Sequence, residues 1–256
     1  MAVAIIAHRG VHDGDSDENT MRAFRLALNE DSIDGVECDV RYSKDNELVI
    51  VHDANLLRTH NVNIKVGDTP YANLPVNIPL LEDLLALFAA HSTKTVIIDY
   101  KTKDRTPDAI TEVEELAIHY DCQCSIVHLV WQDYYDFARG DRLLQHPVYF
   151  APKKQRANIN YDLLEENGYT GVSVHHDDDR IDEIVRSGLK VNLYGPSHER
   201  QAMVNRTLDD PTNFSITVDV PPGFDAGVGG PVAAPRLRLH IQRLTTPITP
   251  ATAHTP

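Results

Sequence analysis

Short apolar segments alternate with amphipathic segments along most of the chain, and this alternation constrains the fold more than any other feature. An apolar run of strand length predicts a buried strand, and an apolar face repeated every three to four residues predicts a helix. Eight strands are predicted in this way, starting near residues 3, 34, 95, 125, 148, 171, 189 and 214. Each strand after the first follows a predicted helix. Alternating strands and helices favour a parallel sheet, and eight such units favour a closed (β/α)8 TIM barrel, an α/β fold.

An open, doubly wound sheet is the main alternative fold. Such a sheet would carry a glycine-rich phosphate loop directly after its first strand. The first apolar run, residues 2–7, instead ends in His8-Arg9-Gly10. We therefore predict the barrel for residues 1–220.

The composition changes at residue 221. Seven of the fifteen prolines lie in residues 221–256, and glycine, alanine and threonine fill much of the rest. This composition predicts an irregular C-terminal tail with no packed core of its own. The tail is a candidate site for a protein partner or for self-association.

A β-hairpin extension is predicted after the second barrel strand. Glu37 and Asp39 are two residues apart on that strand, so their side chains project from the same face. The apolar run at residues 48–52 returns too soon for a parallel crossover. With residues 45–46 as a two-residue turn, His52 would lie directly opposite Asp39. Directly paired residues share a face, so the two carboxylates and the imidazole are predicted to converge.

Charged and titratable side chains gather at the ends of the first three barrel strands, counting the hairpin with the second. The C-terminal ends of barrel strands are where active sites form. The candidate site residues are His8, Arg9, Glu37, Asp39, His52, Asp99 and Lys101.

These residue types suit one kind of chemistry. Three converging carboxylates repel one another unless a cation lies among them, and all-oxygen ligands favour Mg²⁺ or Ca²⁺ over Zn²⁺. Two histidines, whose ordinary pKa is near neutrality, can act as general base and general acid. Arg9 and Lys101 would bind an anionic oxygen. Together these groups supply what the hydrolysis of a phosphodiester needs.

The same residues also admit structural interpretations. Asp39 with Arg9, and Glu37 with Lys101, could form ion pairs that only hold the fold. The acidic run His175–Asp179 resembles a metal site by composition, but a solvated loop that caps the next helix explains it better. Trp131 is predicted to pack in a helix.

The composition excludes several classes of protein. A formal net charge of −14 argues against sequence-independent binding of nucleic acid. No apolar run is long enough for stable insertion across a bilayer, and residues 1–7 lack the charged start of a signal peptide. Three cysteines are too few for a disulfide framework, which favours a reducing, cytoplasmic location.

Motifs in the first part of the chain resemble the glycerophosphodiester phosphodiesterase family, within the phospholipase C-like phosphodiesterases. They occur in the family's order and cover the first third of the sequence, with a looser match beyond it. The motifs are His8-Arg9-Gly10, Glu18-Asn19-Thr20, Gly35-Val36-Glu37-Cys38-Asp39-Val40, Val49-Ile50-Val51-His52-Asp53, Leu57-Arg58-Thr59, Pro79-Leu80-Leu81-Glu82 and Asp99-Tyr100-Lys101.

The resemblance implies a barrel enzyme of lipid metabolism that hydrolyses glycerophosphodiesters to glycerol 3-phosphate and an alcohol. By position it implies one divalent cation, Mg²⁺ or Ca²⁺, held by Glu37, Asp39 and Asp99. His8 and His52 would be the catalytic acid–base pair, and Arg9 and Lys101 would bind phosphate.

The sequence also departs from the family, which usually has glutamate at the position of Asp99 and a tryptophan near the seventh strand, where Leu193-Tyr194 stands here. Two alternatives follow. One is the cleavage of choline lipids, as in the related sphingomyelinase D and phospholipase D-like enzymes. The other is a non-catalytic barrel with a structural or assembly role through its tail.

Overall fold

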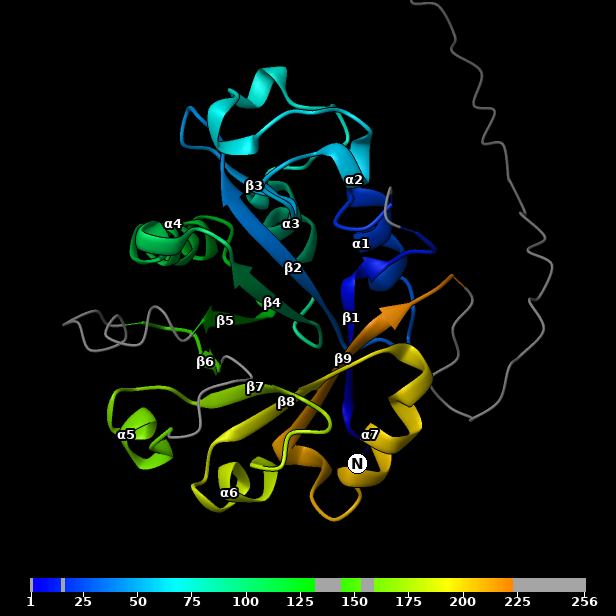
Figure 1. The fold of residues 1–256 in the computed structure, drawn as a ribbon, viewed down its shortest axis with the longest axis vertical. Helices are drawn as coiled ribbons and strands as arrows, with labels where there is room; N and C mark the ends of the chain where they lie inside the picture. The colour runs from blue at the N-terminus through cyan, green and yellow to red at the C-terminus, as the bar shows by residue number, and fades with distance from the viewer. Residues whose placement is uncertain (1, 15–16, 132–143, 153–158, 223–256) are drawn as a thin grey trace, which may run out of the picture.

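A computed structural model of the chain describes residues 2–14, 17–131, 144–152 and 159–222. Eight parallel strands close into a barrel in the order β1-β2-β4-β5-β6-β7-β8-β9, and β9 pairs again with β1 (Figure 1). The predicted (β/α)8 barrel is confirmed, and each predicted start lies within one residue of the observed one. The strands are β1 (Ala4–Val11), β2 (Gly35–Tyr42), β3 (Leu48–Ile50, outside the barrel), β4 (Thr95–Tyr100), β5 (Ser125–Trp131), β6 (Val148–Ala151), β7 (Gly171–His175), β8 (Lys190–Tyr194) and β9 (Phe214–Val220).

Helices cover the outside of the barrel (Figure 1). They are α1 (Met21–Leu28), α3 (Leu81–Phe88), α4 (Thr106–His119), α5 (Tyr161–Glu166), α6 (Ile181–Arg186) and α7 (Arg200–Arg206), with a short α2 (Leu57–His60) beyond β3. Within the described residues, no helix is both long and apolar enough to cross a membrane. The helix predicted near residues 132–144 and almost all of the predicted tail, residues 221–256, lie outside the described residues. The role of the tail therefore stays a prediction.

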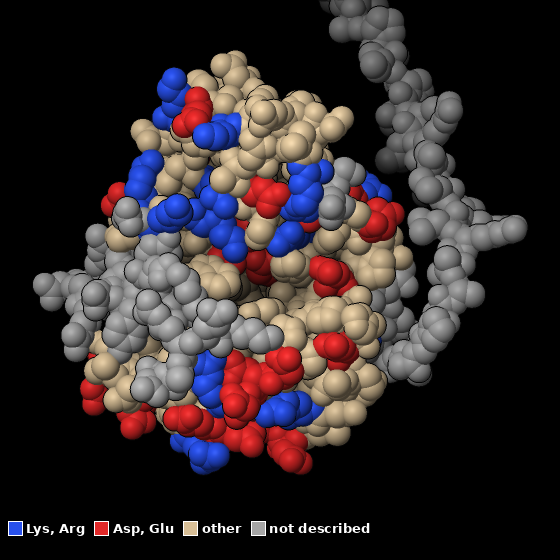
Figure 2. Space-filling model, viewed as in Figure 1, with Lys and Arg blue, Asp and Glu red and all other residues tan. Residues whose placement is uncertain are grey.

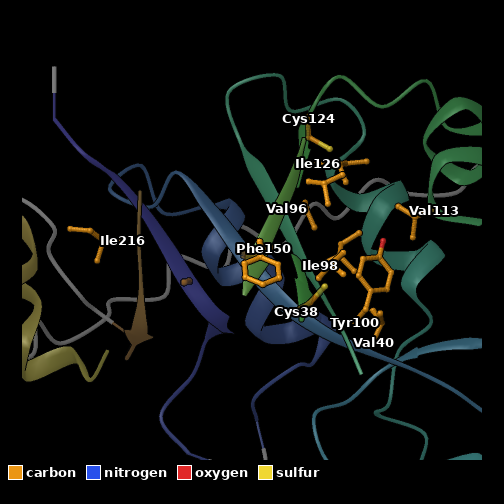
Figure 3. Close-up of a cluster of buried hydrophobic side chains, with 14 of the residues drawn as sticks. Cys38, Val40, Val96, Ile98, Tyr100, Val113, Cys124, Ile126, Phe150 and Ile216 are labelled. Atoms are coloured by element: carbon orange, nitrogen blue, oxygen red, sulfur yellow. The ribbon is translucent and has the colours of Figure 1, made fainter. Parts of the chain in front are cut away.

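The main apolar core lies between the barrel wall and the helices rather than inside the barrel. Side chains alternate in direction along a strand. On β4, Val96, Ile98 and Tyr100 point outward, where Figure 3 shows them beside Val113 of α4, and all four are at most 1% exposed. Because this outer layer supplies the packing, the inner face of the same strand is free to carry a carboxylate, Asp99.

The hairpin after β2 is confirmed, but its predicted register is wrong by one residue. Val51, not His52, lies across from Asp39, and its N–H donates to the Asp39 carbonyl at 2.9 Å. The loop holds three residues, 44–46, rather than two. Asn46 ends it with a φ of 70°, a left-handed conformation that asparagine tolerates and that three-residue hairpin loops require at this point. His52 therefore follows the strand instead of pairing within it.

Residues 51–80 form an excursion from the barrel between β3 and α3, drawn in cyan in Figure 1. It carries α2 and two short 3₁₀ turns, Val66–Asp68 and Tyr71–Asn73. The excursion and β3 share a small apolar cluster that is separate from the main core. The buried members of this cluster are Val49, Val51, Leu56, Val66, Leu74 and Ile78.

A buried polar network ties α4 to the barrel wall. The Glu114 carboxylate accepts hydrogen bonds from His128 Nε2 at 3.1 Å, from His146 Nδ1 at 2.8 Å, and from two backbone N–H groups. His128 is fully buried, and its Nδ1 meets the Tyr100 hydroxyl at 2.7 Å. Burial raises the pKa of Glu114, but the hydrogen bonds from the two histidines outweigh it and lower this pKa overall. The network therefore stabilises the fold only while Glu114 is ionised.

Replacing Glu114 with glutamine should lower the free energy of unfolding at pH 7 by about 1–3 kcal/mol, because the donors around the carboxylate lose their acceptor. The folded-state pKa lies below the unfolded value of about 4.3, so the contribution is complete above that pH and is lost as the pH falls through the folded-state pKa. The gap between variant and wild type should therefore narrow below about pH 4. Urea unfolding at pH 7 and pH 3.5 measures both effects. The same change at exposed Glu115 is the control, and an equal loss from both variants would contradict the role of the network.

Candidate active site

A cavity of about 430 Å³ opens at the C-terminal ends of the barrel strands. Figure 2 shows this hollow with acidic atoms deep inside it and Lys and Arg side chains gathered on the side of the excursion. All of the candidate site residues chosen from the sequence line it: His8, Arg9, Glu37, Asp39, His52, Asp99 and Lys101. The structure thus brings the predicted side chains together, while their chemical roles stay predictions.

Three carboxylates form the floor of the cavity. Glu37 and Asp39 come from β2, and Asp99 lies directly beside Asp39 on β4. All three are at most 5% exposed. One oxygen from each falls within 4.8 Å of the other two. Their convergence follows from the strand period of two and the parallel register, as the sequence predicts.

Two cations hold Asp39 ionised. Arg9 Nε lies 3.1 Å from one of its oxygens, and Lys101 Nζ lies 3.3 Å from the other. Burial raises the pKa of Asp39, but the two positive charges outweigh it and lower the pKa. Of the two ion pairs considered as structural, the pair of Arg9 with Asp39 forms. Lys101 does not pair with Glu37. It pairs instead with Asp39, at 3.3 Å, and with Asp99, at 2.7 Å.

Glu37 has the opposite electrostatic environment. Burial and the charge of Asp39 raise the pKa of Glu37 to about 8. Burial likewise raises the pKa of Asp99, against the opposing charge of Lys101. With all three acids ionised, their negative charge would exceed what Arg9 and Lys101 offset by one unit. Three buried oxygens at this spacing fit a hard divalent cation, which would relieve the excess.

His8 reaches the cavity from within β1, where it lies beside Glu37 of β2. Its Nδ1 lies 2.7 Å from Asp219 on β9, and its Nε2 lies 3.8 Å from Glu37. Burial lowers the pKa of His8, but Glu37 and Asp219 outweigh it and raise the pKa. Because Asp219 holds Nδ1, the ring presents Nε2 to the acids. Sequence reasoning did not select Asp219, although its position near the end of the last strand was a usable signal.

His52 reaches the cavity from the opposite side, just beyond β3. Its Nδ1 lies 2.6 Å from Asp53, whose other oxygen accepts from Arg58 at 2.7 Å. Arg41 Nε donates to the carbonyl of His52 at 2.8 Å and fixes its backbone. Both cavity histidines thus have an aspartate on Nδ1, which leaves Nε2 for proton transfer.

Glu18 and Asn19 support the site from the loop before α1, and sequence reasoning gave them no role in the site. Glu18 binds both Arg9, at 3.0 Å, and Arg58, at 2.6 Å. Asn19 donates from its side-chain amide to Asp39 at 2.8 Å. Their place beside each other in one of the family-like motifs was the signal that could have found them.

Trp131 was predicted to pack in a helix, and this prediction is wrong. It is the last residue of β5 and lines the cavity. Its indole N–H donates to Asp99 at 2.7 Å, and Lys101 Nζ lies 5.0 Å from the centre of its ring. The strand period places Val127, Leu129 and Trp131 on one face, so alternation along the strand could have shown that the side chain points inward.

The acidic run after β7 is a loop, but its predicted capping role is wrong. Helix α6 has Arg180 at its N-cap and no side-chain cap, while Asp178 accepts hydrogen bonds from Arg180. His175 and His176 place ring nitrogens within 4.8 Å of a Glu199 oxygen. None of these residues lines the catalytic cavity.

Comparison with known proteins gives a consistent set of relatives. The sequence model described as the glycerophosphoryl diester phosphodiesterase family matches residues 8–221. A glycerophosphodiester phosphodiesterase from Bacillus altitudinis is 36% identical over 177 residues, which cover 63% of this chain and 68% of that protein. A lysophospholipase D from Rattus norvegicus is 33% identical over 135 residues, or 45% of this chain and 41% of that protein.

Solved structures share the fold at lower sequence identity. An Oleispira antarctica phosphodiesterase, in complex with the product sn-glycerol-3-phosphate, matches with a TM-score of 0.67 at 20% identity, over 84% of this chain and 92% of that one. A glycerophosphodiester phosphodiesterase from Thermotoga maritima matches with a TM-score of 0.65 at 19% identity, over 85% and 95%. These likenesses support the barrel itself.

Proposed function

Because the chain belongs to the glycerophosphoryl diester phosphodiesterase family, we propose that it hydrolyses glycerophosphodiesters to glycerol 3-phosphate and an alcohol. The observation that carries this proposal is the cavity itself. It combines three buried carboxylates, two histidines anchored by aspartates, and two cations at one end of the barrel.

Glu37, Asp39 and Asp99 would hold one divalent cation, Mg²⁺ or Ca²⁺. A bound cation would supply Lewis-acid polarisation of the phosphate oxygens and offset the charge of the acids. Arg9 and Lys101 already face these carboxylates, so they stand where a phosphate bound beside the acids would meet positive charge. Their role is to bind and orient the phosphate and to offset charge that develops in the transition state.

His8 and His52 act as the acid–base pair of the proposed reaction. One Nε2 accepts the proton of the attacking oxygen, and the other donates a proton to the oxygen of the leaving alcohol. When water attacks, glycerol 3-phosphate forms directly. When a neighbouring hydroxyl of the glycerol attacks, a cyclic phosphate forms, and water then opens it with the two histidines in exchanged roles. The aspartates at Nδ1 keep both rings in the tautomer and orientation that this exchange needs.

A second candidate substrate is a lysolipid. The excursion carries two exposed apolar side chains, Leu57 at 57% and Val76 at 102% exposure, and Leu57 and His52 line the same surface pocket. An acyl chain would need such apolar surface near the reacting phosphate. Choline-lipid cleavage on vesicles, with no turnover of deacylated glycerophosphocholine, would favour this candidate.

The direct test measures release of glycerol 3-phosphate from glycerophosphocholine, glycerophosphoethanolamine and glycerophosphoinositol. We expect turnover that EDTA abolishes and that Mg²⁺ or Ca²⁺ restores, because the three acids need a cation to bind the anionic substrate beside them. Activity that survives EDTA would contradict the cation site. A lack of turnover on all three substrates and on lysolipid would contradict the proposed function.

A further inference from the structure

The inner face of β5 ends directly above one of the candidate cation ligands. Leu129 lies opposite Asp99 in the register between β5 and β4. Trp131 lies two residues further on and on the same face, so its indole extends over the carboxylate from the open end of the barrel. From this position the Trp131 side chain can fix the carboxylate of Asp99 from the open end of the barrel.

Both oxygens of Asp99 have a partner. Trp131 Nε1 donates to Oδ1 at 2.7 Å, and Lys101 Nζ donates to Oδ2 at 2.7 Å. Lys101 Nζ also lies 5.0 Å from the centre of the Trp131 ring, so the three side chains contact one another in a closed triangle. A carboxylate bonded at both oxygens has less rotational freedom than one bonded at a single oxygen, and Asp99 is bonded at both.

The two partners differ in what they do to the charge. Lys101 supplies a positive charge, which offsets the carboxylate and competes with any cation. The indole N–H is neutral and only donates, so it fixes the orientation of the carboxylate and leaves its charge in place. An oxygen that accepts one hydrogen bond keeps a further lone pair, which points elsewhere.

We infer that Trp131 is a positioning residue that fixes the orientation of the Asp99 carboxylate for the cation that Glu37, Asp39 and Asp99 would hold, and so sets the affinity of the site. The inference rests on the proposed cation site of Glu37, Asp39 and Asp99. Asp99 has a short side chain on a strand, so it can adjust its position toward a cation less than a longer side chain such as glutamate could. Its fixed orientation therefore has a larger effect on cation affinity. Partners of this kind in other metal sites change affinity or activity by about 10–100-fold when they are removed.

Trp131 is the one tryptophan in the sequence, which makes the inference directly observable. The protein should show a single indole N–H resonance in a nitrogen-15 correlation spectrum, shifted downfield and slow to exchange with water. Replacing Asp99 with asparagine should move this resonance and speed its exchange, because the charged acceptor is gone. A resonance that Asp99→Asn leaves unmoved overturns the inference, and this measurement needs neither substitution of Trp131 nor a bound cation.

Replacing Trp131 with phenylalanine keeps an aromatic ring under Lys101 and removes the N–H. Calorimetric titration with Mg²⁺ and with Ca²⁺ should show a Kd raised by about 10–100-fold. At saturating cation, kcat should return toward the wild-type value, whereas the cation concentration for half-activity should stay raised. A residue that only packs would lower the melting temperature in EDTA and leave the Kd unchanged, and that result would overturn the inference.

Tyr149→Phe is the matched control. It also removes one polar atom from an aromatic ring inside the barrel, but Tyr149 lines a cavity at the opposite end. Its cation Kd should equal that of the wild type, and a rise equal to that of Trp131→Phe would overturn the inference. If the wild-type protein binds neither cation in the calorimeter, the proposed cation site itself fails. That failure is read on the unmodified protein and is distinct from the outcome for Trp131.

Discussion

Replacing His52 with alanine should lower kcat for glycerophosphodiester hydrolysis by about 10²–10⁴-fold, the range expected when a general acid or base is removed. The side chain is about one-third exposed, at 35%, and follows the end of β3, so its loss creates no cavity in the core. We therefore expect an unchanged melting temperature. Initial rates with saturating substrate and cation measure the effect.

His91→Ala is the control for this result. His91 is exposed, lies just after α3, and does not line the cavity. Its removal should leave kcat within a factor of two or so of wild type, as is usual for a surface side chain away from any site. Full turnover in the His52 variant, with the fold intact, would exclude acid–base catalysis by this residue.

Replacing Asp39 with asparagine should have an effect on activity of similar size, about 10²–10³-fold in kcat/KM. Asparagine keeps the shape of the side chain but removes the charge that faces Arg9 and Lys101. Breaking a buried ion pair typically lowers the free energy of unfolding by about 3–5 kcal/mol, and we expect a smaller decrease here. The loss is limited because Glu18 still contacts Arg9, and Asp99 still contacts Lys101.

A pH signature separates this electrostatic effect from a loss of packing. In wild-type protein without cation, the pKa of Glu37 is raised to about 8, so the folded state binds a proton that the unfolded state releases above about pH 4.3. The free energy of unfolding should therefore fall as the pH rises from 5 to 8. Asp39→Asn removes one cause of the raised pKa and should flatten this slope, as should Glu37→Gln. A wild-type slope of zero in EDTA would contradict the electrostatic account.

The barrel could be predicted from the sequence because its strands are apolar runs of strand length that alternate with amphipathic segments. Runs such as residues 95–100 are apolar until the position where the strand reaches the cavity. Both the strand and the end of it that carries the site residues can therefore be identified. The convergence of Glu37, Asp39 and Asp99 follows from the strand period alone. A parallel register between neighbours then brings them to one level.

The register of the hairpin could not be predicted because two turn types compete for the same residues. Asp45-Asn46 fits a two-residue turn, and 44–46 with Asn46 left-handed fits a three-residue loop. The two differ by one residue in every pairing that follows. His52 still reaches the cavity because the strand ends at Ile50, and the chain beyond it is not bound by the alternation.

Contacts made across long sequence separations were also missed. Asp219 lies 211 residues from His8 in the chain, and no local pattern links them. Trp131 was assigned to the helix expected after it, although it is the last residue of the strand. A boundary error of one residue thus moved a cavity side chain into the helical layer.

The excursion has a consequence for how the molecule can move and change. Its apolar cluster is separate from the main core, and polar contacts such as the ion pair of Arg58 with Glu18 tie it to the rest of the protein. It can therefore open as a local unit, with amide hydrogens that exchange faster than those of β2 and β4. Substitutions within its apolar cluster should therefore change the stability of the excursion more than that of the barrel.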